Sequence, residues 1–113
     1  MDEIESLAQI LKALSDPTRL HLLKLLGNTS EDNLPEGCHS APKGPLYLCV
    51  NAMTKHLNVT QSAVSQHLRV LRQAGLVRGE RRGSFVHYTL DLDGISMYKT
   101  KLANVLGVTF IAS

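Results

Sequence analysis

Apolar residues recur three and four positions apart in the first part of the chain, a spacing that predicts helices. The first such stretch lies within residues 1–15 and places its apolar positions on one face. Its members are Ile4, Leu7, Ile10, Leu11 and Leu14. Asp16 and Pro17 predict the start of a second, leucine-rich helix, because a carboxylate caps free N–H groups and proline fits a first helical turn. Gly27 is the predicted end of that helix.

Residues 27–46 break the helical pattern and predict a long loop. The segment is polar and holds three of the four prolines of the chain. A loop of about twenty residues in a small domain is usually functional or disordered.

The second half of the chain predicts two helices joined by a tight turn, then a β-hairpin and a last helix. Helical spacing covers residues 50–73, and Thr60 is the predicted N-cap of the second helix of this pair. Residues 76–91 alternate between apolar and polar on both sides of a turn, which predicts the hairpin. Helical spacing returns in residues 93–106. The predicted fold is mainly α with a β-hairpin wing, in the order α-α-α-α-β-β-α, within one domain spanning residues 1–113.

Positive charge is concentrated in this second half. Residues 51–90 have a formal charge of +5, whereas the whole chain has +2, so the remaining residues carry −3. The basic residues are Lys55, Arg69, Arg72, Arg78, Arg81 and Arg82, and the one acid is Glu80. Such an excess is expected of a surface that faces phosphates, although a solvated basic surface has the same composition.

The second helix of the predicted pair carries a polar stripe opposite its apolar positions. The members of the stripe are Ser62, Ser65, Gln66 and Arg69. A helix fits the major groove of DNA, where Gln and Ser side chains can hydrogen-bond base edges. The free N–H groups after Thr60 can hold a phosphate, and Arg81 and Arg82 at the predicted hairpin tip can contact the backbone or the minor groove. This layout is typical of a winged helix-turn-helix and predicts double-stranded DNA as the partner.

Several longer runs resemble the ArsR/SmtB family of transcriptional repressors. The runs are Ala13–Arg19, Leu48–Val50, Leu57–Arg72, Ala74–Val77 and Arg81–Gly83, with His87 and Tyr88. The resemblance implies a homodimer built from residues 1–15 and 93–106, and a repressor that leaves its operator when an inducer binds. It also implies base contacts at Gln61, Ser62, Ser65 and Gln66.

The chain departs from the metal-responsive members of that family. In those members the third helix carries a pattern similar to Cys-Val-Cys, in which two thiolates bind a soft metal. This chain has Cys49, Val50 and Asn51 at these positions. The last helix contains no histidine, so the zinc ligands of other members are absent there. Cys38, beside His39 in the long loop, and Cys49 remain. Three interpretations stay open: structural cysteines, a reversible redox disulfide, or ligands of a soft or thiophilic metal ion.

Other classes of function find less support in the sequence. The chain has no glycine-rich phosphate loop and no nucleophile–base pair at a recognised spacing, so an enzyme is not expected. The alternative is a winged helix that binds protein without specific DNA binding, which would expose apolar anchors where this chain has polar and basic residues. The N-terminus does not resemble a secretory signal and no window is long enough to span a membrane, so a cytoplasmic location is expected.

Overall fold

A computed structural model describes residues 2–28, 48–82 and 85–109, with side chains for all of these except Leu48, Cys49, Arg82 and Phe85. The helices of this part of the chain are α1 (Glu3–Leu14), α2 (Pro17–Asn28), α3 (Val50–Leu57), α4 (Gln61–Gln73) and α5 (Leu92–Leu106). The strands are β1 (Leu48–Cys49), β2 (Val77–Arg82) and β3 (Phe85–Leu90). They form an antiparallel sheet in the order β1-β3-β2.

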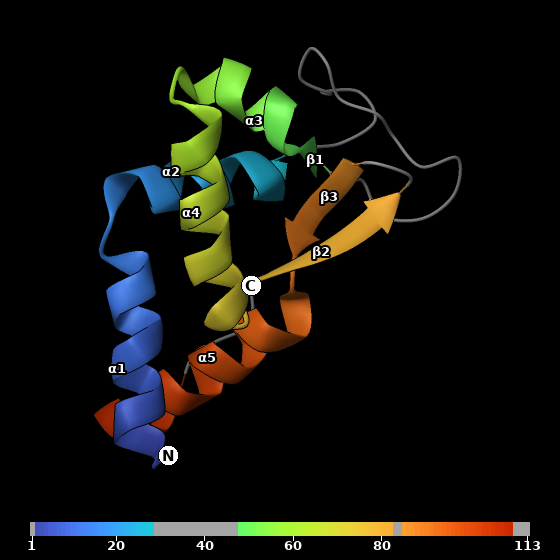
Figure 1. Ribbon diagram of the computed structural model, residues 1–113. Helices are drawn as coiled ribbons and strands as arrows, with labels where there is room; N and C mark the ends of the chain where they lie inside the picture. The colour runs from blue at the N-terminus through green and yellow to red at the C-terminus, as the bar shows by residue number, and fades with distance from the viewer. Residues whose placement is uncertain (1, 29–47, 83–84, 110–113) are drawn as a thin grey trace.

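The apolar core lies between α2, α3, α4 and the start of β2. Its largest fully buried side chains are Leu22, Met53, Val64, Leu68, Leu71, Leu76 and Val77. Figure 1 shows α2 passing behind α4, with α3 at the upper end of α4 and the β2–β3 hairpin to one side. Helices α1 and α5 lie together at the lower end, where Lys101 Nζ donates to Ser6 Oγ over 2.7 Å.

Short side chains define where the helices begin. The Asp16 carboxylate accepts a hydrogen bond from the Arg19 N–H at 3.1 Å, and Thr60 Oγ1 accepts one from the Ala63 N–H at 3.1 Å. Both interactions satisfy N–H groups that have no partner within the helix. The turn between α3 and α4 places Asn58 at a φ of 54°, in the left-handed region that asparagine tolerates better than most residues. The predicted caps at Asp16 and Thr60 are therefore present.

The sheet register separates two faces. Val77 pairs with Leu90 and Gly79 pairs with Tyr88, and Val77, Tyr88 and Leu90 all belong to or pack against the core. Because side chains alternate along a strand, Glu80 and His87, which pair with one another, lie on the opposite face. The hairpin therefore has one face toward the helices and one face away from them.

The predicted winged helix-turn-helix fold, mainly helical with a β-hairpin, is confirmed. Some details differ. The two-residue strand β1 was not predicted, so the order of the described elements is α-α-β-α-α-β-β-α. Helix α2 continues through Gly27 to Asn28. Gly27 does not have the positive φ with which a glycine usually ends a helix. The predicted loop at residues 27–46 therefore begins inside α2, and the rest of it lies outside the described residues.

Arg81 and Arg82, predicted at the tip of the hairpin, are the last two residues of β2 and pair with Val86 and Phe85 at the start of β3. The last helix begins at Leu92, with the Asp91 carboxylate accepting from the Gly94 N–H at 3.0 Å. Among the described residues, no helix is both long enough and apolar enough to cross a membrane.

Candidate nucleic-acid interface

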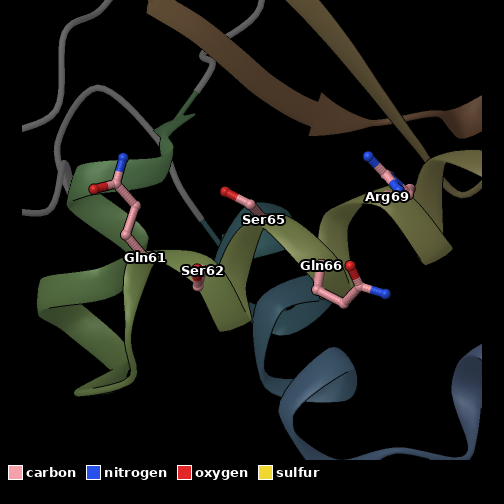
Figure 2. Close-up of a pocket in the computed structure, with 5 residues that line it drawn as sticks. All are labelled: Gln61, Ser62, Ser65, Gln66 and Arg69. Atoms are coloured by element: carbon pink, nitrogen blue, oxygen red, sulfur yellow. The ribbon is translucent and has the colours of Figure 1, made fainter.

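Helix α4 has one buried face and one exposed polar face. Val64, Leu68 and Leu71 are fully buried. The opposite face carries exposed Gln61, Ser62, Ser65, Gln66 and Arg69, which line an open depression of about 370 Å³. Figure 2 shows all five side chains projecting from α4. The predicted polar stripe is therefore continuous and accessible, and it is held in place by the packing of the other face.

The first turn of α4 is an accessible helix N-terminus. Thr60 and Gln61 are both exposed, and Thr60 uses its side-chain oxygen to cap the N–H of Ala63. N–H groups at the start of a helix that have no partner within it carry partial positive charge and bind anions well. This end of α4 can therefore bind a phosphate beside the side chains that project from the helix.

The wing contributes positive charge on β2. Arg78 and Arg81 are exposed, and Arg82 belongs to the same strand, although its side chain lies outside the described part. Figure 1 shows the hairpin extending to one side of α4. Arg78 was counted in the basic region of the sequence but not among the predicted site residues. The alternation along β2, which leaves Arg78 facing away from the buried Val77, was the signal that could have included it.

Asp16, just before α2, forms an ion pair with Arg19 in the first turn of that helix. Arg19 Nη2 lies 3.8 Å from Asp16 Oδ2. The hydrogen bond from the Arg19 backbone N–H holds the pKa of Asp16 below its usual value; burial opposes this effect and the nearby His67 of α4 adds to it. His67 is partly buried, as expected for a histidine next to the buried Val64 and Leu68.

The predicted thiol residues are only partly described. Cys38 lies outside the described residues, and Cys49 belongs to β1, with its backbone alone described. Among the side chains that the structure does describe, no three His, Cys, Asp or Glu residues are grouped so that they could hold a metal ion. The pairing of Cys38 with Cys49, as a metal site or a disulfide, stays a prediction.

Comparison with known proteins agrees with this geometry. The sequence model of the arsR family of bacterial regulatory proteins matches residues 43–78. The uncharacterised helix-turn-helix-type transcriptional regulator YbzH of Bacillus subtilis is 36% identical over 99 residues, covering 87% of this chain and 92% of that protein. The transcriptional repressor SdpR, also from Bacillus subtilis, is 30% identical over 84 residues, covering 73% of this chain and 72% of that protein.

The fold has solved counterparts. One is the homodimeric winged helix-turn-helix DNA-binding domain Mb0332 from Mycobacterium bovis, at a TM-score of 0.63 and 22% identity, covering 92% of this chain and 80% of that one. The relatives are transcriptional regulators rather than enzymes, in agreement with the prediction from sequence. This chain belongs to the ArsR family of bacterial helix-turn-helix transcriptional regulators.

Proposed function

We propose that this protein is a homodimeric, cytoplasmic transcriptional repressor that binds its operator by placing α4 in the major groove of double-stranded DNA. The observation that carries the proposal is the exposed polar face of α4, backed by a fully buried apolar face. A recognition helix needs both features, because its base contacts are specific only if the helix is held rigidly against the rest of the domain.

The residues of the interface have separate roles in this proposal. Gln61, Ser62, Ser65 and Gln66 contact base edges, where their amides and hydroxyls can both donate and accept hydrogen bonds. The N–H groups that follow Thr60 hold a phosphate. Arg69, Arg81 and Arg82 contact phosphates or the adjacent minor groove and fix the position of the protein on the duplex.

The proposed homodimer uses α1 and α5. These helices expose apolar side chains in the single chain: Ile4, Leu11, Met97, Val105 and Leu106. The related domain from Mycobacterium bovis is described as homodimeric, which supports a dimer of the same kind. Two copies related by a twofold axis would present two recognition helices to two half-sites.

The experiment compares operator DNA with random DNA. The DNA upstream of the protein's own gene is the operator DNA tested. Substituting Gln66→Ala or Ser65→Ala is expected to cost about 1–3 kcal/mol of binding free energy on the operator and much less on random DNA. The measurement is fluorescence anisotropy at fixed salt. Lys24→Ala, at an exposed position on α2, is the control and should leave both affinities unchanged. Equal losses on both DNAs would remove Gln66 and Ser65 from base recognition.

The proposal includes release from the operator by a small effector, a soft metal or a thiol redox signal, with Cys38 and Cys49 as the candidate sensing residues. Operator affinity is therefore measured with reduced protein, with oxidised protein and during titration with Cd(II) or As(III). We expect the operator affinity to fall by about tenfold or more in one of these states, and we expect Cys49→Ser to abolish this fall. Equal affinity in every state would make the cysteines structural.

A further inference from the structure

The C-terminal end of α4 meets the first turn of α5 main chain to main chain. A Cβ atom added to Gly94 would lie 1.7 Å from the carbonyl oxygen of Gly75 and 2.9 Å from its carbonyl carbon. Both of these atoms belong to the backbone, so no side-chain rotation can make room for a methyl group at position 94. Figure 1 shows the lower end of α4 next to the first turns of α5. The close approach, here called the Gly75–Gly94 contact, therefore requires glycine at position 94.

Main-chain hydrogen bonds fix the α4 side of this contact. Gly75 has a φ of 78°, in the left-handed region. Its N–H donates to the Arg72 carbonyl at 3.0 Å, and the N–H of Leu76 donates to the Leu71 carbonyl at 3.0 Å. Such a pair of bonds commonly ends a helix at a left-handed glycine. Leu71 and Leu76 are fully buried, so the end of α4 that carries the Gly75 carbonyl is anchored in the core.

Asp91 holds the α5 side of the contact. Its N–H donates to the carbonyl of Leu76, the residue after Gly75, at 2.9 Å. Its carboxylate accepts from the Gly94 N–H at 3.0 Å, and its carbonyl accepts from the Ile95 N–H at 2.9 Å. Alanine is a better helix former than glycine, so the needs of the α5 turn itself do not explain a glycine at position 94. The close approach to Gly75 does explain it.

Helix α5 connects this contact to the proposed dimer surface. Further along α5, Lys101 Nζ donates to Ser6 Oγ of α1 at 2.7 Å, so the two helices are held together. Helix α4 carries the polar face that the proposed function assigns to the operator. The Gly75–Gly94 contact is therefore a main-chain link between the helix proposed to enter the major groove and the helices proposed to join the two copies.

We propose that Gly94 is a positioning residue that sets the separation of the two α4 helices in the dimer, and thereby the half-site spacing that the protein selects. A dimer gains affinity from its second half-site only if both recognition helices reach their grooves together. Base-pair steps are about 3.4 Å long, so a shift of each α4 by about 1–2 Å is enough to disturb the fit to the natural spacing. The effect on DNA rests on the proposed function, whereas the helix separation can be measured without DNA.

The DNA experiment compares one half-site with two. Gly94→Ala forces the new Cβ atom and the Gly75 oxygen apart to ordinary contact, which begins at 3.4 Å, so α5 has to shift on α4. Footprinting of the wild type on the DNA upstream of its gene defines the operator. Fluorescence anisotropy then gives affinities for the operator, for a single half-site, and for operators with one base pair added or removed at the centre.

The ratio of operator affinity to half-site affinity measures the contribution of the second half-site. We expect this ratio to fall by at least about tenfold in Gly94→Ala, while the single half-site is bound as by the wild type. The variant should also lose the preference for the natural spacing over the two altered spacings. An unchanged ratio, or an equal loss of affinity for operator and half-site, would overturn the positioning role.

Two control variants separate displacement from loss of stability. In Gly27→Ala, on α2, the new Cβ atom would meet only the end of the Leu90 side chain, at 3.3 Å. In Gly75→Asn, the new Cβ atom would have nothing within 4 Å, and asparagine tolerates the left-handed region. Both variants should keep the ratio of the wild type. If the ratio instead follows the urea midpoint across all three variants, Gly94 acts through stability alone and the proposal is wrong.

The separation of the α4 helices is measured without DNA. A nitroxide at Ser62→Cys, at the exposed start of α4, reports the distance between the two copies by double electron–electron resonance. The other two cysteines are replaced by Cys38→Ser and Cys49→Ser in every sample, and circular dichroism checks each fold. Gly94→Ala is expected to shift the most populated distance, and Gly27→Ala is expected to leave it unchanged.

Asp91→Ala provides a second test if Gly94→Ala does not fold. It removes the acceptor of the Gly94 N–H without adding an atom to the contact, so the distribution of distances should broaden. Unchanged distances in Gly94→Ala, unchanged distances in Asp91→Ala, or a wild type that stays monomeric would overturn the proposal. If the distances change as expected but the wild type binds its operator no better than random DNA, the proposed function fails and the positioning of the α4 helices by Gly94 stands.

Discussion

Thr60 fixes the first turn of α4 through one hydrogen bond. Its Oγ1 accepts from the Ala63 N–H at 3.1 Å, and its own carbonyl accepts from Val64 at 3.0 Å. Thr60→Ala removes the side-chain acceptor and is expected to lower the free energy of unfolding by about 1 kcal/mol. Thr60→Ser keeps a hydroxyl at the same position and should be close to wild type. Urea unfolding of the three proteins measures the difference, and identical midpoints would show that the cap contributes nothing to stability.

Residue roles that depend on near neighbours could be predicted from the sequence. The caps at Asp16 and Thr60 follow from residue type and from the helical pattern that comes after them. The start of α5 was placed one residue late, at Asp93 instead of Leu92, because Asp91 and Asp93 are both residue types that suit a cap and only the backbone conformation selects Asp91. The ion pair of Asp16 with Arg19 was not predicted, since it depends on the side-chain geometry of the capped turn.

At the scale of single elements, the wing supplies positive charge, whereas the polar side chains proposed to contact bases belong to α4. Arg81 is exposed on β2, and its pairing with Val86 holds its backbone in the sheet. Arg81→Ala is expected to weaken binding to operator and random DNA alike, and to reduce the slope of log affinity against log salt by about one unit, because one phosphate contact is lost. Lys24→Ala on α2 is the matched control. A slope equal to that of the wild type would show that Arg81 does not contact phosphate.

Helices and strands in which apolar residues recur at a regular spacing could be predicted, whereas β1 could not. The buried face of α4 and the alternation of the hairpin are visible in the sequence because each repeats over many residues. Strand β1 has only two residues, Leu48 and Cys49, too few to show alternation, and it exists only through pairing with Tyr88 and His87.

At the scale of the whole molecule, two kinds of surface occupy different elements. The polar face of α4 and the basic strand β2 carry the proposed DNA contacts, while α1 and α5 expose apolar side chains. The apolar stripe of α1 was predicted, but the sequence did not show which of its residues are buried within the chain and which are exposed. Leu7 and Ile10 are buried within the chain, whereas Ile4 and Leu11 are 60% and 42% exposed. Only tertiary packing decides which part of a stripe the chain covers itself.

The exposed residues of α1 and α5 lead to a prediction about assembly. The two helices are joined by the hydrogen bonds from Lys101 to Ser6 and from Asn104 to Glu3, so they are held together as one unit. Ile4→Glu combined with Leu106→Glu places charges at two exposed positions of this unit in each copy. Burying a large apolar side chain contributes about 1.5–3 kcal/mol, so the double substitution is expected to weaken dimerisation by at least a factor of about one hundred.

Sedimentation velocity across a concentration series measures this change, and circular dichroism should stay that of the wild type because neither position is buried in the single chain. Leu20→Glu is the control: Leu20 is 50% exposed on α2, outside the α1–α5 unit, and its substitution should leave the dimer intact. Operator affinity should fall with the dimer, because a monomer binds one half-site and loses the contribution of the second. If the double variant remains a dimer, the two copies associate through another surface, and the spacing of their recognition helices has to be derived from that surface instead.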